Sequence, residues 1–211
     1  MIHEDILNSD QLTILSKIKS IPKESYLAGG TALALQLEHR TSLDLDFYTK
    51  KHFKTEILLK SLENEFREIK VEQIASDTLI LELLGVSFSL FYYPYDLISP
   101  LVPFRNIKLA SIADIAAMKM IAISMRGKRR DFVDLYYLLN EFNLAELIKF
   151  TLKKYPSYQP MAILKGLIYF EDAKDEDLSR GIKIFDKNFS WEKAKERILK
   201  EVKNYQLSMI H

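Results

Sequence analysis

The chain has 211 residues, of which 48% are hydrophobic and 28% charged, so it is neither disordered nor of low complexity. Cysteine is absent, which excludes disulfides, thiolate zinc sites and cysteine nucleophiles. The net charge of +1, the acidic start and the lack of a long apolar run argue against a general nucleic-acid binder, a signal peptide and a membrane partner, and we expect a cytoplasmic protein.

The first elements form a strand, a tight turn and a helix. Apolar residues at helical spacing predict a helix over 10–21 that Pro22 ends, and the apolar segment 26–28 predicts a short strand. In the segment 29–31, two glycines permit a tight turn, and the threonine that follows is expected to cap a helix over 32–38.

The next part of the chain predicts a mixed sheet. Strict alternation over 43–48 predicts a half-buried strand, and apolar spacing over 54–66 predicts a helix. Three further segments have the composition of strands, and they are 71–74, 78–84 and 86–93.

The second half of the chain reads as helical. Ser111 and Asp114 have the spacing that opens a helix, which should run to about residue 125 and end at Gly127. Helices are also predicted over 130–141 and 191–205, with one or two between them after residue 156. The fold class is therefore α+β, a mixed sheet with flanking helices followed by a helical C-terminal half.

Asp44 and Asp46 are candidate ligands of a divalent metal ion. Two residues apart on a strand, their carboxylates leave the same face roughly 7 Å apart at Cα. Magnesium prefers oxygen ligands and is commonly shared between one or two carboxylates and substrate phosphates. The alternative is a polar, solvent-facing strand edge.

The Gly29-Gly30-Thr31 turn is a candidate phosphate site, because a helix that starts after a strand offers free backbone N–H groups to an anion. A purely structural turn is the alternative. Arg40 could neutralise a phosphate or pair with the metal carboxylates, and the sequence favours neither. Histidine chemistry is discounted, because the four histidines have no ligand spacing.

The helical half carries charges in unexpected places. Lys119 interrupts an otherwise apolar helix face, and it could either extend to solvent or meet a triphosphate. Asp131 and Asp134 share one face of the next helix, where the helix dipole explains the first better than the second. A basic cluster could be solvated charge or a surface for RNA phosphates, and it comprises Arg126, Arg129 and Arg130.

Four motifs together resemble the AbiEii/AbiGii toxin family of nucleotidyltransferases, within the polymerase-beta-type superfamily and similar to MenT toxins. They are Tyr26-Leu-Ala-Gly-Gly-Thr-Ala-Leu-Ala-Leu, His39-Arg40-x-Ser42-x-Asp44-x-Asp46-Phe47, Lys119-x6-Arg126-x3-Arg130-Asp131-x2-Asp134-Leu135 and Ile168-Tyr-Phe-Glu-Asp-Ala173. Each motif is modest, but their order and spacing cover nearly the whole chain.

The resemblance implies a nucleotidyltransferase α/β domain over 1–105 and a helical domain over 106–211 that packs on it and completes an active-site cleft. It implies transfer of a nucleoside monophosphate from an NTP to an acceptor hydroxyl, such as the 3' end of a tRNA. The biological setting would be a bacterial toxin–antitoxin or phage-defence (abortive infection) system, with an antitoxin encoded nearby.

The resemblance also implies roles for individual residues. Asp44 and Asp46 would bind Mg²⁺ or Mn²⁺. Lys119 and Asp131 would complete the catalytic set. The nucleotide would be contacted by Gly29, Gly30, Thr31, Arg40, Lys119, Arg126 and Asp134. RNA would lie on Arg126, Arg129 and Arg130.

One departure from the superfamily concerns its usual third carboxylate on a later strand. The segment 86–93 offers only Ser87 and Ser89, and Glu82 on the preceding strand is a weak substitute. Asp131 could act as the general base instead, which requires only hydrogen-bond reach. If it does not, two alternatives remain, namely an impaired nucleotide-binding module and a phosphotransferase on the same scaffold.

Overall fold

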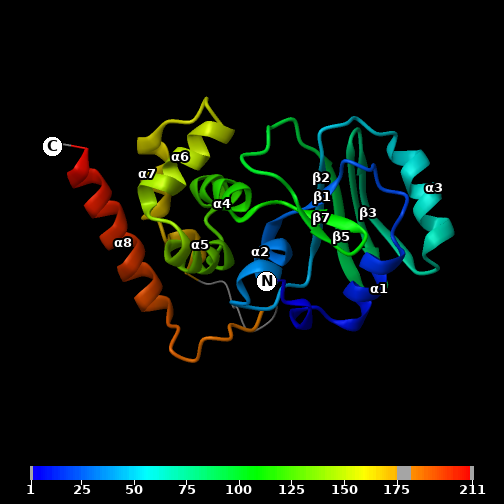
Figure 1. Ribbon diagram of the computed structural model, residues 1–211, viewed down its shortest axis with the longest axis horizontal. Coiled ribbons are helices and arrows are strands. Elements are labelled where there is room, and N and C mark those ends of the chain that lie inside the picture. The colour runs from blue at the N-terminus through cyan, green and yellow to red at the C-terminus, as the bar shows by residue number, and fades with distance from the viewer. Residues whose placement is uncertain (1, 175–181, 210–211) are drawn as a thin grey trace. The chain divides into compact units, whose positions relative to one another are not determined.

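A computed structural model describes residues 2–174 and 182–209 (Figure 1). The chain divides into two compact units, Met1–Ser111 and Ile112–His211. The first contains the sheet and the second is helical, which confirms the predicted α+β class. Among the described residues, no helix combines the length and the apolar character needed to cross a membrane.

The first unit is built on a mixed seven-stranded sheet of order β3-β4-β5-β2-β1-β7-β6. β2 pairs in parallel with β5, and β1 pairs in parallel with β7, whereas the other neighbours are antiparallel. The strands are β1 Tyr26–Leu27, β2 Leu45–Thr49, β3 Ile69–Ala75, β4 Thr78–Leu83, β5 Val86–Tyr92, β6 Val102–Phe104 and β7 Ile107–Leu109. Short helices accompany them, η1 Glu4–Ile6, α1 Ser9–Lys17, α2 Gly29–Leu37 and α3 Thr55–Glu65.

The alternation of side chains divides the sheet into a buried face and a half-exposed face. In β2, Leu45 and Phe47 are fully buried, whereas Asp46 and Tyr48 between them are partly exposed. β4 repeats this pattern, and α3 packs against β3 and β4 with Leu58 and Leu62. Successive side chains of a strand point to opposite faces, so α3 and the buried apolar side chains occupy one face, and Asp46 and Tyr48 of β2 point to the other.

Two expectations for this unit were wrong in detail, and one pair of strands was not predicted. The first long helix ends at Lys17, well before Pro22. Thr31 does not cap α2, because the helix starts at Gly29 and its N-cap residue is Ala28. The hairpin β6–β7 was not predicted, and the predicted boundary between residues 105 and 106 falls in its turn.

The second unit consists of helices packed around α4. They are α4 Ile112–Arg126, α5 Arg129–Glu141, α6 Leu144–Lys154, α7 Pro160–Leu167, η2 Glu171–Ala173 and α8 Trp191–Ser208. Helix α6 was not predicted, although its N-terminus has a complete capping box formed by Asn143 and Glu146. Gly127 ends α4 with a φ of 43°.

Two features hold the helical unit together besides aliphatic packing. An aromatic group of Phe132, Phe170 and Trp191 joins α5 to the chain around η2 and to α8, with ring centroids 5.0–5.9 Å apart. Lys154 Nζ lies 2.8 Å from Asp114 Oδ1, and both side chains are completely buried. Asp114, which the sequence placed at a helix start, is thus half of an internal ion pair between α6 and α4.

Candidate active site

The glycine turn lies against the side chains of the second motif. A Cβ added to Gly29, whose φ is 66°, would stand 2.9 Å from Asp46 Oδ2. A Cβ added to Gly30 would stand 2.6 Å from Arg40 Nη2 and 3.0 Å from Ser42 Oγ. A side chain at either position would therefore displace these polar groups, which glycine leaves in place.

Backbone hydrogen bonds fix the position of β2 beside the turn. The Ala28 N–H donates to the Asp46 carbonyl over 2.9 Å, and the Thr31 hydroxyl donates to the Asp44 carbonyl. Thr31, which was predicted to cap the helix, therefore connects the start of α2 to the segment before β2. Thr31 lies in the first turn of α2 and is not the N-cap residue, so its hydroxyl is available to bond the Asp44 carbonyl.

Asp46 receives support from the neighbouring strand. Ser89 on β5 is the register partner of Asp46, and its hydroxyl donates to Asp46 Oδ1 over 2.7 Å. Such a hydrogen bond orients a carboxylate and fixes the direction of its lone pairs. Ser89 thus occupies the strand position beside Asp46 where a third carboxylate was sought.

Glu82 does not lie beside Asp46. Asp46 is in register with Ser89, which pairs with Ile80 of β4, whereas Glu82 pairs with Ser87. Glu82 is thus two strands away and displaced along the sheet, and its Oε2 lies 3.8 Å from Lys70 Nζ. It is not a substitute for the third carboxylate.

The positions of Asp44 and Arg40 refine the predicted geometry. Asp44 precedes β2 instead of lying within it, so the spacing of an ideal strand does not apply to the pair Asp44 and Asp46. Arg40 is 1% exposed and its Nη1 donates to the Thr41 carbonyl over 2.8 Å. With Gly30 against its guanidinium, Arg40 supports the turn from within the protein.

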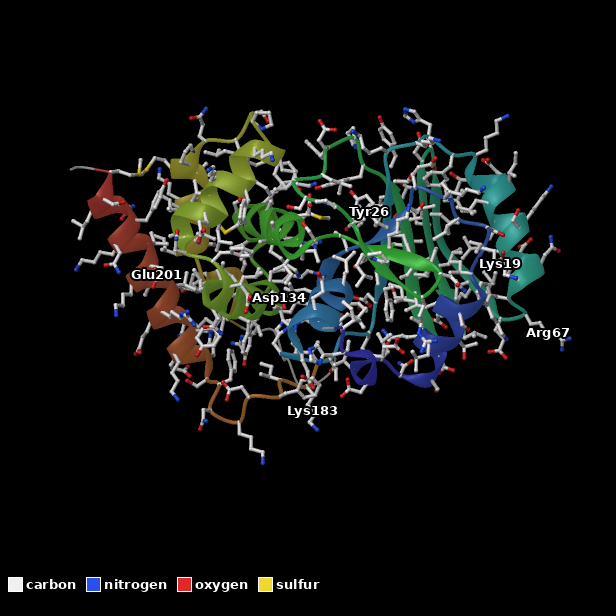
Figure 2. All side chains as sticks on the ribbon, viewed as in Figure 1. Lys19, Tyr26, Arg67, Asp134, Lys183 and Glu201 are labelled. Carbon is white, nitrogen blue, oxygen red and sulfur yellow. The ribbon has the colours of Figure 1, made fainter. Side chains whose placement is uncertain are left out.

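Charged residues of α4 and α5 meet in the second unit. Lys119 Nζ lies 2.6 Å from Asp131 Oδ1 and 2.6 Å from Asp134 Oδ2, and the three side chains are at most 9% exposed. Asp134 is labelled in Figure 2. Of the two alternatives for Lys119, a side chain that extends to solvent does not agree with this buried cluster. Asp131 Oδ2 is buried and has no hydrogen-bond partner among the described residues.

The basic cluster after α4 is divided by its contacts. Arg129 donates to the carbonyls of Ala173 and Lys174, and its guanidinium lies 5.0 Å from the centre of the Trp191 ring. These contacts give Arg129 a structural role, and the RNA contact at this partly exposed residue stays a prediction. Arg126 is exposed and Arg130 partly exposed.

A histidine-containing cluster lies at the far end of α2 from the glycine turn. Ligand atoms of His3, Asp5 and Glu38 lie within 4.8 Å of one another. His3 Nδ1 is 2.8 Å from Glu38 Oε2, and both side chains are substantially exposed. The His3–Glu38 contact is an ordinary surface ion pair, which contributes little to stability.

Comparison with known proteins identifies the family. A family model described as the nucleotidyl transferase AbiEii toxin of a type IV toxin–antitoxin system matches residues 85–204, more than half of the chain. The chain belongs to the AbiEii family. A protein of Aquifex aeolicus (strain VF5), the uncharacterized protein aq_aa25, is 37% identical over 209 residues, which cover 94% of this chain and 97% of that protein. That similarity includes the glycine turn and β2, which the family model does not reach.

Solved structures share the fold of this AbiEii family member. MenT4, a nucleotidyltransferase toxin from Mycobacterium tuberculosis H37Rv, matches with a TM-score of 0.59 and 16% identity, covering 92% of this chain and 82% of that one. JHP933 from Helicobacter pylori matches with a TM-score of 0.52 and 18% identity, covering 99% and 98%. The family and the nucleotidyltransferase fold predicted from the motifs are confirmed.

Proposed function

We propose that this AbiEii family member transfers a nucleoside monophosphate from an NTP to an acceptor hydroxyl and uses a divalent metal ion to do so. The acceptor oxygen forms a bond to the α-phosphorus while the bond to the pyrophosphate oxygen breaks. The hydroxyl proton goes to a protein base, and pyrophosphate leaves.

The observation that carries this proposal is the contact of Gly29 with Asp46. The turn brings the N-terminus of α2, where N–H groups lack helical partners, directly to a carboxylate. An anion at the helix start and a cation at the carboxylate would therefore be neighbours. Triphosphate with magnesium is the substrate that combines these two charges.

The donor set fits a hard divalent ion. Asp44 and Asp46 supply carboxylate oxygens, both side chains are partly exposed, and Ser89 orients one of them. Magnesium is commonly held by one or two carboxylates, with substrate phosphates and water as further ligands. When bound, the metal ion would stabilise the charge that develops on the phosphates during transfer.

For the base we propose Asp131. Its Oδ1 is paired with Lys119, whereas its buried Oδ2 has no hydrogen-bond partner in the described part of the chain. A buried carboxylate oxygen without a donor can accept a proton or a hydroxyl group. Lys119 would bring positive charge to the phosphates, and Asp134 would hold the lysine ammonium in place.

As partners we propose an RNA acceptor, with the 3' end of tRNA as the first candidate, and an antitoxin encoded by a neighbouring gene. Arg126 and Arg130 remain candidates for RNA phosphates. Neutralised phosphates release counterions, so RNA binding should weaken steeply as salt is raised.

The proposal is tested by incubating the protein with each of the four NTPs, Mg²⁺ and total tRNA, labelled in parallel at the α- and the γ-phosphate. Transfer of α-label to RNA, lost in Asp46→Ala, is the expected result. Transfer of γ-label would instead identify a phosphotransferase. Absence of label from RNA and from protein, together with unchanged toxicity of Asp46→Ala, would refute the proposal.

The serine in the third-carboxylate position favours one alternative, a nucleotide-binding module without transfer activity. Such a module would be stabilised against heat by NTP and Mg²⁺ through mass action, yet would release no pyrophosphate. The thermal-shift titration and the labelling assay together distinguish it from an enzyme.

A further inference from the structure

A row of side chains crosses the half-exposed face of the sheet next to the candidate metal site. Tyr26 of β1 is the register partner of Tyr48 of β2, and Tyr48 is the partner of Phe91 of β5. Asp46 and Ser89 lie two residues earlier in the same strands, so they share this face. The row therefore lies two residues further along β2 and β5 than Asp46 and Ser89, on the same face of the sheet.

The rings of this row are in contact and continue beyond the sheet. The Tyr48 ring centroid lies 6.1 Å from that of Tyr26, 5.7 Å from that of Phe91 and 5.0 Å from that of Tyr93. Tyr93 in turn lies 5.0 Å from Tyr95. We call these five residues the aromatic strip. Its exposure rises from 2% at Tyr26 to 37% at Tyr95, so one end is anchored and the other presents rings to solvent.

The aromatic strip and the glycine turn lie on opposite sides of Asp46. β1 runs antiparallel to β2, and it reaches the turn where Ala28 bonds the Asp46 carbonyl. Tyr48 lies further along β2, beside the start of β1. Displacement at phosphorus is in line, with the attacking and leaving oxygens opposite each other. If the turn holds the leaving pyrophosphate, the strip lies on the side of the attacking hydroxyl.

We propose that the aromatic strip stacks unpaired bases of a single-stranded RNA end and so holds the acceptor for transfer. This inference rests on the proposed function, because it assigns the turn to the triphosphate. Aromatic rings stack bases of any sequence, which suits an enzyme that acts on a chain end. Tyr93 and Tyr95 follow the last residue of β5, and we assign the main stacking surfaces to them.

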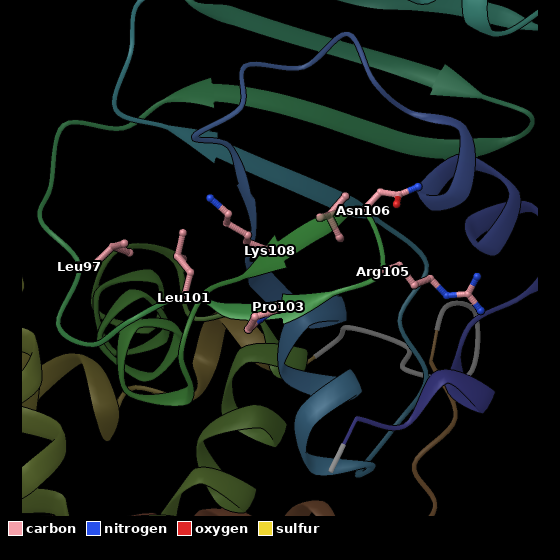
Figure 3. Close-up of a pocket in the computed structure, with 7 residues that line it drawn as sticks. Leu97, Leu101, Pro103, Arg105, Asn106 and Lys108 are labelled. Atoms are coloured by element: carbon pink, nitrogen blue, oxygen red, sulfur yellow. The ribbon is translucent and has the colours of Figure 1, made fainter.

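A positively charged side chain of β7 lies on the same face of the sheet as Tyr26. Leu27 pairs with Leu109 in parallel strands, and Tyr26 and the exposed Lys108 each come one residue before this pair. Lys108 lines a pocket of about 540 Å³ together with the β6–β7 turn and Leu97 and Leu101 of the preceding loop (Figure 3). A lysine beside stacked rings is the combination that single-stranded nucleic acid requires for its backbone and its bases.

The test is fluorescence anisotropy with a labelled single-stranded RNA hexamer and with an abasic oligomer of equal length and charge. In Tyr93→Leu, the Kd for the hexamer should rise about tenfold or more, whereas the Kd for the abasic oligomer should not change. Tyr93→Trp should restore hexamer binding, since any aromatic ring can stack. Tyr169→Leu, which removes an aromatic residue that is 55% exposed but outside the strip, is the matched control.

Three results would overturn the inference. Unchanged hexamer affinity in Tyr93→Leu would mean that the strip does not stack the acceptor. Equal loss with both oligomers would mean that Tyr93 does not act on the bases, and would overturn the stacking role. Loss of the NTP-induced thermal shift with unchanged RNA binding would place the donor base on the strip. Failure of the proposed function is recognised separately, because the wild-type protein would then bind RNA without transferring α-label.

Discussion

Gly29→Ala gives a precise test of the contact between the glycine turn and Asp46, because the chain contains a matched control. Gly29 and Gly85 both have positive φ, 66° and 78°. A Cβ at Gly29 would stand 2.9 Å from Asp46 Oδ2, whereas a Cβ at Gly85 would meet no atom within 4 Å. The two substitutions therefore impose similar backbone strain but differ in what the methyl group touches.

The effect on stability should be similar and modest in the two variants. A left-handed conformation costs an L-residue roughly 1–2 kcal/mol, and the loss of glycine freedom in the unfolded chain offsets about 0.4–1 kcal/mol of this. A net loss of about 1 kcal/mol lowers Tm by roughly 4–8 °C in a domain of around 100 residues. Differential scanning calorimetry of both variants would measure this shift.

The effect on activity should differ. In Gly29→Ala the Asp46 carboxylate must move by several tenths of an ångström, and a misplacement of about 1 Å can cost about 100-fold in rate. We expect a loss of about 10–100-fold in nucleotide transfer for Gly29→Ala and less than about twofold for Gly85→Ala. Equal activities in two variants of equal stability would refute the placement of the turn against a catalytic carboxylate.

Three further predictions concern single contacts. Ser89→Ala should lower activity about 10–100-fold and raise the Mg²⁺ concentration needed for half-maximal rate, because Asp46 loses its orienting hydrogen bond; an unchanged Mg²⁺ titration would contradict this role. Asp131→Asn should lower kcat about 100-fold or more with little change in the KM for NTP; a variant with unchanged kcat would remove Asp131 as the base. Lys154→Met should lower the free energy of unfolding, measured in urea, by about 3–5 kcal/mol, because the buried Asp114 charge loses its partner. Adding Asp114→Leu should recover most of this loss, because an apolar pair costs less than an unpaired buried charge. A double variant no more stable than the single one would show that this ion pair is not the reason for the loss.

The fold was predictable where the periodicity was strong. Alternation located β2, and strand composition located β4 and β5, within two residues, and apolar spacing located α3 and α5. The hairpin β6–β7 was missed because its strands have only three residues each and one contains Pro103, which reads as a break. The first helix ends before the point that its apolar spacing predicts. Ile18 is buried, as the spacing predicts, but its backbone is extended, and a pattern of buried residues does not show this difference.

The site was predictable in its composition but less so in its geometry. The motifs brought out Gly29, Asp46 and Lys119, yet the partner of Asp46 lies 43 residues away on β5 and depends on strand register. In the sequence, Ser89 was recognisable only as a strand position without the expected carboxylate. Arg129 was assigned to RNA because its charge is visible in the sequence, whereas its contacts with Ala173 and Trp191 require the tertiary fold.

The most direct test of nucleotide transfer at Asp46 is the ratio of pyrophosphate released to nucleotide incorporated, measured with α-labelled NTP for the wild-type protein and for Asp46→Asn. We predict one pyrophosphate per incorporated nucleotide, with both products reduced at least about 100-fold in the variant, because the metal ion supplies several kcal/mol of charge stabilisation. Incorporation without pyrophosphate, or equal rates in the two proteins, would contradict nucleotide transfer at this site.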